Sequence, residues 1–155
     1  MPFDLLIAST SYGWYEEYAA VPRDKMLLLE YEDTAIRGSG SFDAALARRV
    51  VEFLGANEEA RDVAFACDAG FSRSPALAAA CLRAWGYGDG CIWLNPNFRP
   101  NTLVYQLTCD AYGIDVTDAE AEELAETNEA ALAAAIDEAT ARMRRLPGRD
   151  GAGCV

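Results

Sequence analysis

The chain has 155 residues, 52% of them apolar, which suits one domain with its own core. Its 25 acidic and 13 basic residues give a formal net charge of −12, which argues against binding to nucleic acid or to an anionic membrane. Histidine is absent, which excludes Ser-His-Asp and Cys-His catalysis and histidine-based metal sites. We therefore expect no metal and no other cofactor.

The cysteines and the first residues indicate a reducing compartment. The five cysteines, at 67, 81, 91, 109 and 154, form no Cys-x-x-Cys pair and favour neither a zinc ribbon nor a disulfide framework. Met1-Pro2-Phe3-Asp4 lacks the features of a signal peptide, and no apolar run approaches the roughly 18 residues that span a bilayer. We expect a cytoplasmic protein, monomeric by default, with its three middle cysteines in the core.

The first half of the chain predicts two strands and a helix. The apolar run at residues 3–9 predicts a strand, and residues 25–31 predict a second, buried strand. Residues 32–41 contain two glycines and predict a mobile loop. Helical spacing of apolar residues follows at 42–54, with Ser41 as the expected N-cap.

The middle of the chain predicts a third strand at residues 62–66. A loop and then a helix from about Ser74 to Trp85 come directly after it. The glycine- and proline-rich stretch that follows is expected to be irregular, with a short extended piece at Ile92–Leu94. Another helix is predicted at 101–112.

The C-terminal third predicts one long helix. Thr117 begins a capping-box pattern, and the helix runs to about residue 146, acidic at its start and basic at its end. We expect it to cover the sheet as an amphipathic helix. Residues 1–146 then form a single α/β domain with a largely parallel central sheet of about four strands flanked by helices. Residues 147–155 are predicted to be a disordered tail.

One loop carries a chemical pattern. Cys67 directly follows the strand at 62–66, and Arg73 stands six residues later where a helix begins. Ligands of such sheets bind at the carboxyl ends of the strands. Gly70 allows a tight turn, and the backbone N–H groups of the loop can form an anion-binding nest. We expect phosphate to be bound by the segment Asp68, Ala69, Gly70, Phe71, Ser72 and Arg73.

The same surroundings activate the cysteine without histidine. Loop amides, the helix N-terminus and the Arg73 guanidinium all favour a thiolate over a thiol. The guanidinium also binds two phosphate oxygens at once. We expect Asp68 either to face outward and offer only its N–H, or to tie down the loop through its carboxylate.

Residues 64–101 resemble the protein tyrosine phosphatase superfamily, and are most similar to its dual-specificity branch. The matching residues are Cys67, Gly70, Arg73, Ser74 and, less specifically, the run Asn95-Pro96-Asn97-Phe98-Arg99-Pro100-Asn101. The resemblance implies a three-layer phosphatase-like fold and a phosphocysteine intermediate on Cys67. It also implies that Arg73 stabilises the transition state and that Ser74 helps the thiolate leave. One departure is Ala66, which replaces the usual histidine and is expected to raise the thiol pKa and slow the reaction. We expect activity to survive, because the amide nest, the helix dipole and Arg73 remain.

The resemblance further implies a carboxylic acid on a loop about thirty residues upstream. Asp33, which follows the strand at 25–31, fits best as the general acid, with Glu32 and Asp43 as reserves. An acidic residue in this position is otherwise an ordinary solvated turn residue.

The sequence is compatible with three functions. The first is hydrolysis of a phosphate monoester, with a phosphorylated protein or a small phosphomonoester as substrate. The second is an inactive module that binds phosphorylated partners in the same nest. The third is a sulfurtransferase, which also places a reactive cysteine between a strand and a helix. Against all three stands the reading of Cys67 as an ordinary core residue.

Overall fold

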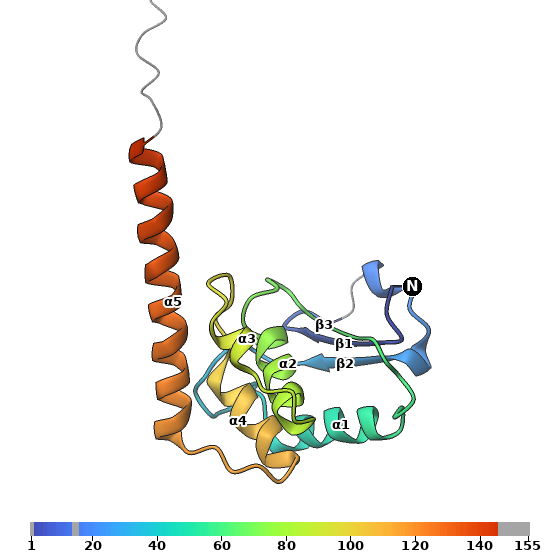
Figure 1. Ribbon diagram of the computed structural model, residues 1–155. Helices are drawn as coiled ribbons and strands as arrows, with labels where there is room; N and C mark the ends of the chain where they lie inside the picture. The colour runs from blue at the N-terminus through green and yellow to red at the C-terminus, as the bar shows by residue number, and fades with distance from the viewer. Residues whose placement is uncertain (1, 14–15, 146–155) are drawn as a thin grey trace, which may run out of the picture.

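The computed structural model describes residues 2–13 and 16–145, and is built on a parallel sheet (Figure 1). The sheet has three strands, β1 (Leu5–Thr10), β2 (Met26–Glu30) and β3 (Val63–Cys67), in the order β2-β1-β3. Leu6 pairs with Met26 and Leu5 with Val63, so the carboxyl ends of all three strands meet at one edge. The predicted tail at 147–155 lies outside the described residues.

The helices follow the sequence patterns closely. They are the 3-10 turns η1 (Glu16–Tyr18) and η2 (Arg23–Lys25) and the helices α1 (Ala44–Gly55), α2 (Arg73–Ala84), α3 (Gly90–Trp93), α4 (Thr102–Ala111) and α5 (Asp118–Arg145). The N-cap of α1 is Asp43, whose Oδ1 accepts from the N–H of Leu46 at 2.8 Å. The expected cap Ser41 instead closes the preceding turn by donating to the carbonyl of Gly38.

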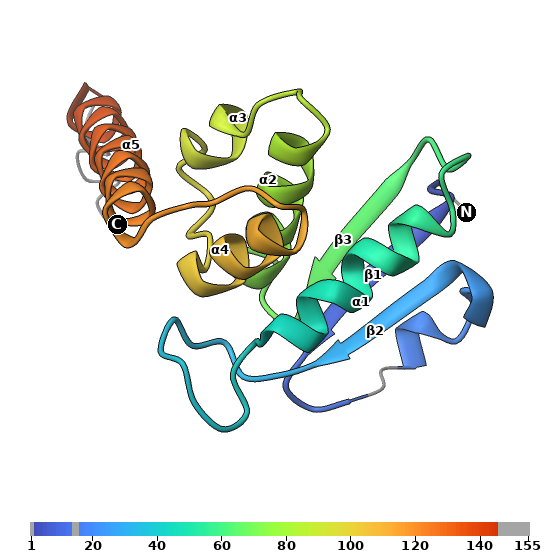
Figure 2. The ribbon, with the colours of Figure 1, turned by 90° about the horizontal axis from the view of Figure 1, so that it is seen from below.

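The core lies between one face of the sheet and three helices. The inward side chains of this face, Leu5, Ile7, Leu29 and Tyr31, pack against residues of α1, α2 and α4. Figure 2 shows α1 lying over the sheet on this side, roughly along the direction of the strands. The other face is covered by the connection between β1 and β2, which contributes Val21 and Tyr18. The α/β prediction is confirmed, but in the described residues α-helices cover one face only, and not two as a three-layer fold requires.

The sheet has three strands among the described residues, and not about four as predicted. The prediction of a short extended piece at Ile92–Leu94 is wrong. These positions form and end α3, where the N–H of Leu94 donates to the carbonyl of Gly90 at 2.9 Å. Trp93 is buried and packs edge-on against Tyr105, with ring centroids 5.1 Å apart. Burial of this indole against α4 favours the helical turn over an unpaired strand.

The long helix α5 does not cover the sheet. It packs against α3 and α4 at the side of the molecule, and its second half extends beyond the body (Figure 1). On this projecting part Ile136 and Met143 are exposed. The buried side chains of α5, Ala121 and Asn128, lie in the first half of the helix. None of the helices in the described residues is long and apolar enough to cross a membrane.

The cysteines expected in the core divide into two groups. Cys81 and Cys109 are fully buried, as predicted. Cys91 is exposed, contrary to the prediction, because α3 is a single turn whose inner side is occupied by Trp93. The general tendency of cysteine to be buried therefore predicts the positions of Cys81 and Cys109 correctly. It fails for Cys91, which lies in a short helix at the surface.

Asn128 ties α5 to the body, and its loss should be costly. This buried side chain donates through Nδ2 to the carbonyls of Trp93 at 2.9 Å and Asn95 at 3.2 Å, while Oδ1 accepts from Arg99. Asn128→Ala leaves buried groups unpaired, so we expect a loss of about 1–3 kcal/mol in the free energy of unfolding, measured by urea denaturation. Ile136→Ala, on the projecting half, should change it by less than about 0.5 kcal/mol. Equal effects of the two substitutions would contradict the anchoring role.

Candidate active site

The carboxyl edge of the sheet brings three segments together. Cys67 is the last residue of β3, and the loop 68–72 leads from it into α2. Ser11 follows β1, and Tyr31 and Asp33 follow β2, at the same edge. Parallel strands therefore collect at one place residues that are up to 62 positions apart in the chain.

The loop 68–72 turns tightly around its glycine. Gly70 has φ +73°, a left-handed conformation that side chains disfavour, and its N–H donates to the carbonyl of Cys67 at 3.2 Å. A Cβ at this position would contact nothing within 4 Å, so the backbone angle and not space requires glycine. Arg99 and Asn101 donate from their N–H groups to the carbonyls of Phe71 and Ser72, and hold the loop from outside.

The Cys67 thiol lies where hydrogen-bond donors converge. Its Sγ is 3.1 Å from the Ser74 hydroxyl, and the residue is half-buried. Burial alone would raise the pKa of Cys67. The Ser74 hydroxyl and the N–H groups of Ser74, Ser72 and Gly70 outweigh burial and lower the pKa below its usual value. Alanine at position 66 thus leaves a set of donors that still favours the thiolate, and no histidine takes part.

Arg73 is buried and held at one end of its guanidinium. Nη1 donates to the carbonyl of Tyr31 at 2.8 Å and to Oγ of Ser11 at 3.0 Å, and Nη2 donates to Oδ2 of Asp68 at 2.6 Å. The Tyr31 ring lies under the guanidinium, 5.6 Å from Cζ to centroid. Burial would lower the pKa of Arg73, but the hydrogen bond and charge of Asp68, helped by Asp33, raise it. The side chain is therefore a permanent cation.

The Nε–H of Arg73 is buried and has no hydrogen-bond partner. A buried unpaired donor costs about 1–3 kcal/mol, and one on a cation costs more. The nearest carboxylate oxygen, Oδ2 of Asp33, is 4.0 Å from Nε, too far for a hydrogen bond. An anion bound beside Arg73 could accept a hydrogen bond from this donor.

Asp33 is fixed beside this donor by two residues. Its Oδ1 accepts from the Ser72 hydroxyl at 2.8 Å and from Nδ2 of Asn101 at 2.9 Å. Its side chain is 32% exposed, so the carboxyl borders both the loop and the solvent. Both of these hydrogen bonds go to Oδ1, and Oδ2 is the oxygen that lies 4.0 Å from Nε of Arg73. Asp33 is therefore an exposed residue whose carboxyl is held by two side chains at the border of the loop.

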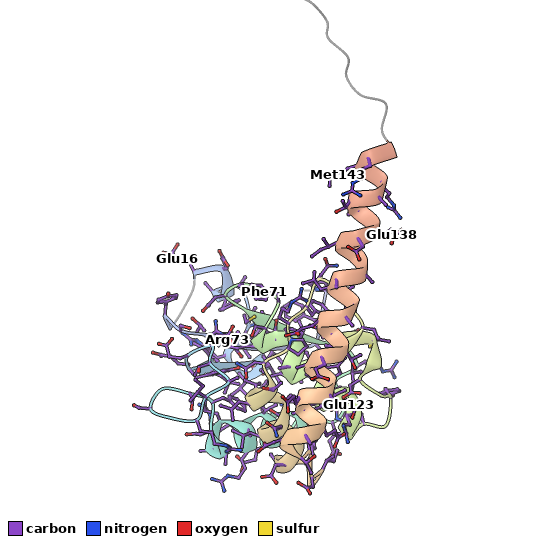
Figure 3. The ribbon with its side chains drawn as sticks, turned by 90° about the vertical axis from the view of Figure 1, so that its left-hand side faces the viewer. Glu16, Phe71, Arg73, Glu123, Glu138 and Met143 are labelled. Carbon is purple, nitrogen blue, oxygen red and sulfur yellow. The ribbon has the colours of Figure 1, made fainter. Side chains whose placement is uncertain are left out.

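The remaining candidate residues take other places. The reserve acid Asp43 caps α1 and is occupied there, and Glu32 is exposed with its N–H donating to the carbonyl of Gly40. Ala69 and Phe71 are exposed on the loop, and Phe71 lies near Arg73 at the surface (Figure 3). Neither side chain contributes a polar group.

Two contributions were missed from the sequence. Ser11 supplies its N–H to Asp68 and its hydroxyl to Arg73, and Tyr31 supplies a carbonyl. The position of Ser11 directly after the first strand was the available signal, because ligand-binding residues collect there in parallel sheets. Asp68 does tie down the loop through its carboxylate, which was one of its two predicted orientations.

Comparison with known proteins gives no independent assignment. No family model, no curated protein and no solved structure matches this chain. The site itself consists of a thiol of lowered pKa, a buried arginine with one unpaired donor and a carboxyl held by two side chains.

The lowered pKa of Cys67 depends on Ser74. In Ser74→Ala the thiolate loses one hydrogen bond, and since a bond to a charged group contributes about 1.5 kcal/mol, the pKa should rise by about one unit. The pH dependence of iodoacetamide labelling, followed at Cys67 by peptide mass spectrometry, measures it. Ser39→Ala, in the exposed loop before α1, should leave the curve in place, and an unchanged curve in Ser74→Ala would contradict this role.

Proposed function

We propose that this protein is a cysteine-dependent phosphatase that hydrolyses phosphate monoesters through a phosphocysteine intermediate, of the protein tyrosine or dual-specificity type. The single observation that carries the proposal is the buried Nε–H of Arg73, which has no hydrogen-bond partner and lies 4.0 Å from the carboxyl of Asp33. Arg73 ends the loop that begins after Cys67, whose thiol has a lowered pKa and contacts Ser74, the neighbour of Arg73 in the chain. These groups meet at the carboxyl edge of a parallel sheet, the usual ligand position in such folds.

In the first step the Cys67 thiolate attacks phosphorus, and the bond from phosphorus to the leaving oxygen breaks. The loop amides and the free donors of Arg73 hold the equatorial oxygens, whose charge is stabilised most in the transition state. The proton on Oδ2 of Asp33 passes to the leaving oxygen, so that an alcohol or phenol departs. The product is phosphocysteine with Asp33 ionised.

In the second step water attacks phosphorus and gives its proton to Asp33. The bond between sulfur and phosphorus breaks, inorganic phosphate forms, and Cys67 regains its thiolate. The Ser74 hydroxyl, 3.1 Å from Sγ, stabilises this leaving thiolate. The two other readings explain less, because a binding module or a sulfurtransferase has no use for the carboxyl held by Ser72 and Asn101.

Release of p-nitrophenolate from p-nitrophenyl phosphate tests the activity. Cys67→Ser should abolish turnover, and Arg73→Lys should lower kcat by about 100-fold or more, because lysine has no planar pair of donors. Cys91→Ser, on the exposed turn α3, is the matched control and should keep the wild-type rate. Mass spectrometry of acid-quenched enzyme should find one phosphoryl group on the peptide of Cys67.

Equal slow release by wild type and Cys67→Ser would refute the phosphatase. Phosphopeptide binding without turnover would then identify the binding module, and cyanide-dependent transfer of sulfur from thiosulfate the sulfurtransferase.

The role of Asp33 is tested by leaving-group dependence. Asp33→Asn keeps an oxygen for Ser72 and Asn101 but has no proton to give, so kcat for phenyl phosphate should fall by about 100-fold. The loss should be smaller for p-nitrophenyl phosphate, whose phenolate leaves without full protonation. Glu32→Gln should leave both rates unchanged, and equal losses for the two substrates in Asp33→Asn would argue against general acid catalysis.

A further inference from the structure

The residue after the nucleophile carries a negative charge into the site. Asp68 has a side chain only 18% exposed, and its Oδ2 accepts both from Nη2 of Arg73 at 2.6 Å and from the N–H of Ser11 at 3.0 Å. Asp68 follows Cys67 in the chain, and a carboxylate near a thiolate or a phosphate would repel either of these anions. Its presence therefore needs an explanation beyond loop geometry.

The contacts of Asp68 determine which side of the guanidinium stays open. Arginine has five N–H bonds, and three of them donate to Ser11, Tyr31 and Asp68. The Nε–H and one N–H of Nη2 remain, and Nε has no partner. These two nitrogens form the edge that binds two oxygens of one anion side by side. Asp68 and its neighbours hold the opposite end.

The hold on Arg73 is rigid because it comes from separate elements. Asp68 belongs to the loop after β3, Ser11 follows β1 and Tyr31 follows β2. Ser11 binds both partners, since its N–H donates to Asp68 and its Oγ accepts from Arg73. The guanidinium is fixed across all three strands of the sheet and cannot rotate about its end without breaking these bonds.

We propose that Asp68 is a positioning residue, which with Ser11 orients Arg73 so that its Nε edge faces the phosphoryl group in the transition state. This inference rests on the proposed phosphatase function. The charge of Arg73 offsets the charge of the Asp68 carboxylate. The pair therefore presents the oriented N–H donors of Arg73 to the phosphoryl group, but attracts an anion only weakly through its net charge. Orientation matters most for the equatorial oxygens of the transition state, whereas net charge acts on bound substrate and transition state alike.

The kinetic signature follows from this distinction. In Asp68→Ala the guanidinium loses its Nη2 anchor, so kcat should fall by about 10- to 100-fold while KM changes by less than about threefold. Asp68→Asn retains an acceptor oxygen without the charge, and should recover kcat to within about threefold of wild type. Ser11→Ala removes one acceptor of Nη1 and should lower kcat in the same direction, by about 3- to 10-fold.

The experiment uses the full chain and a control of the same chemistry. Asp24→Asn removes a carboxylate at an exposed position before β2, at the opposite edge of the sheet, and should match wild type. Kinetics with p-nitrophenyl phosphate are combined with calorimetric binding of orthovanadate, a transition-state mimic, and of inorganic phosphate. Vanadate affinity should fall about tenfold or more in Asp68→Ala, and phosphate affinity by less than about threefold.

Each outcome supports or overturns the inference. Higher kcat/KM or tighter phosphate binding in both Asp68 variants would identify Asp68 as an anion competing for Arg73, and would overturn it. So would unchanged kinetics in Asp68→Ala. If Asp68→Ala does not fold, judged by its melting temperature, a kcat in Ser11→Ala equal to wild type overturns it as well. Failure of the phosphatase proposal is distinct, because wild type itself would then show neither Cys67-dependent turnover nor vanadate binding.

Discussion

The rest of the site depends on the hydrogen bonds that the buried guanidinium of Arg73 makes with its acceptors. A cation removed from water must be matched by acceptors, and Arg73 finds them at the ends of β1 and β2 and in its own loop. The same side chain begins α2, whose next turns form the centre of the core. The fold and the site are therefore coupled, because the hydrogen bonds that join the ends of the strands to Arg73 also fix the orientation of its guanidinium.

These contacts leave the Nε–H of Arg73 without a hydrogen-bond partner, which costs free energy of folding. Nearly every buried polar group in a folded protein has a hydrogen-bond partner, so the unpaired Nε–H of Arg73 requires an explanation. A site that stores an unpaired donor is ready for an anion and needs little reorganisation when charge develops on it. The overall charge of −12 does not oppose this, since nearby donors act at contact distance and distant charges are screened.

The three buried or half-buried cysteines of the described residues show how the surroundings of a thiol set its pKa. Burial raises the pKa of Cys81 to about 12 and that of Cys109 to about 11, which makes both inert. Cys67 is also partly buried, which would raise its pKa, yet its pKa is lowered because the Ser74 hydroxyl and the N–H groups of Ser74, Ser72 and Gly70 outweigh burial. The contrast shows how hydroxyl and amide donors lower a thiol pKa in a chain without histidine.

Local patterns by themselves determined much of this protein. The sequence predicts the three strands, the loop between Cys67 and Arg73 and the glycine at its turn, because strand and helix periods and turn residues act over a few positions. The tertiary structure alone decided where Trp93 is buried, how α5 packs, that Cys91 is exposed, and that Ser11 and the Asp68 carboxylate meet at Arg73. Those outcomes depend on partners far away in the chain, and no local spacing encodes which distant surface a side chain will meet.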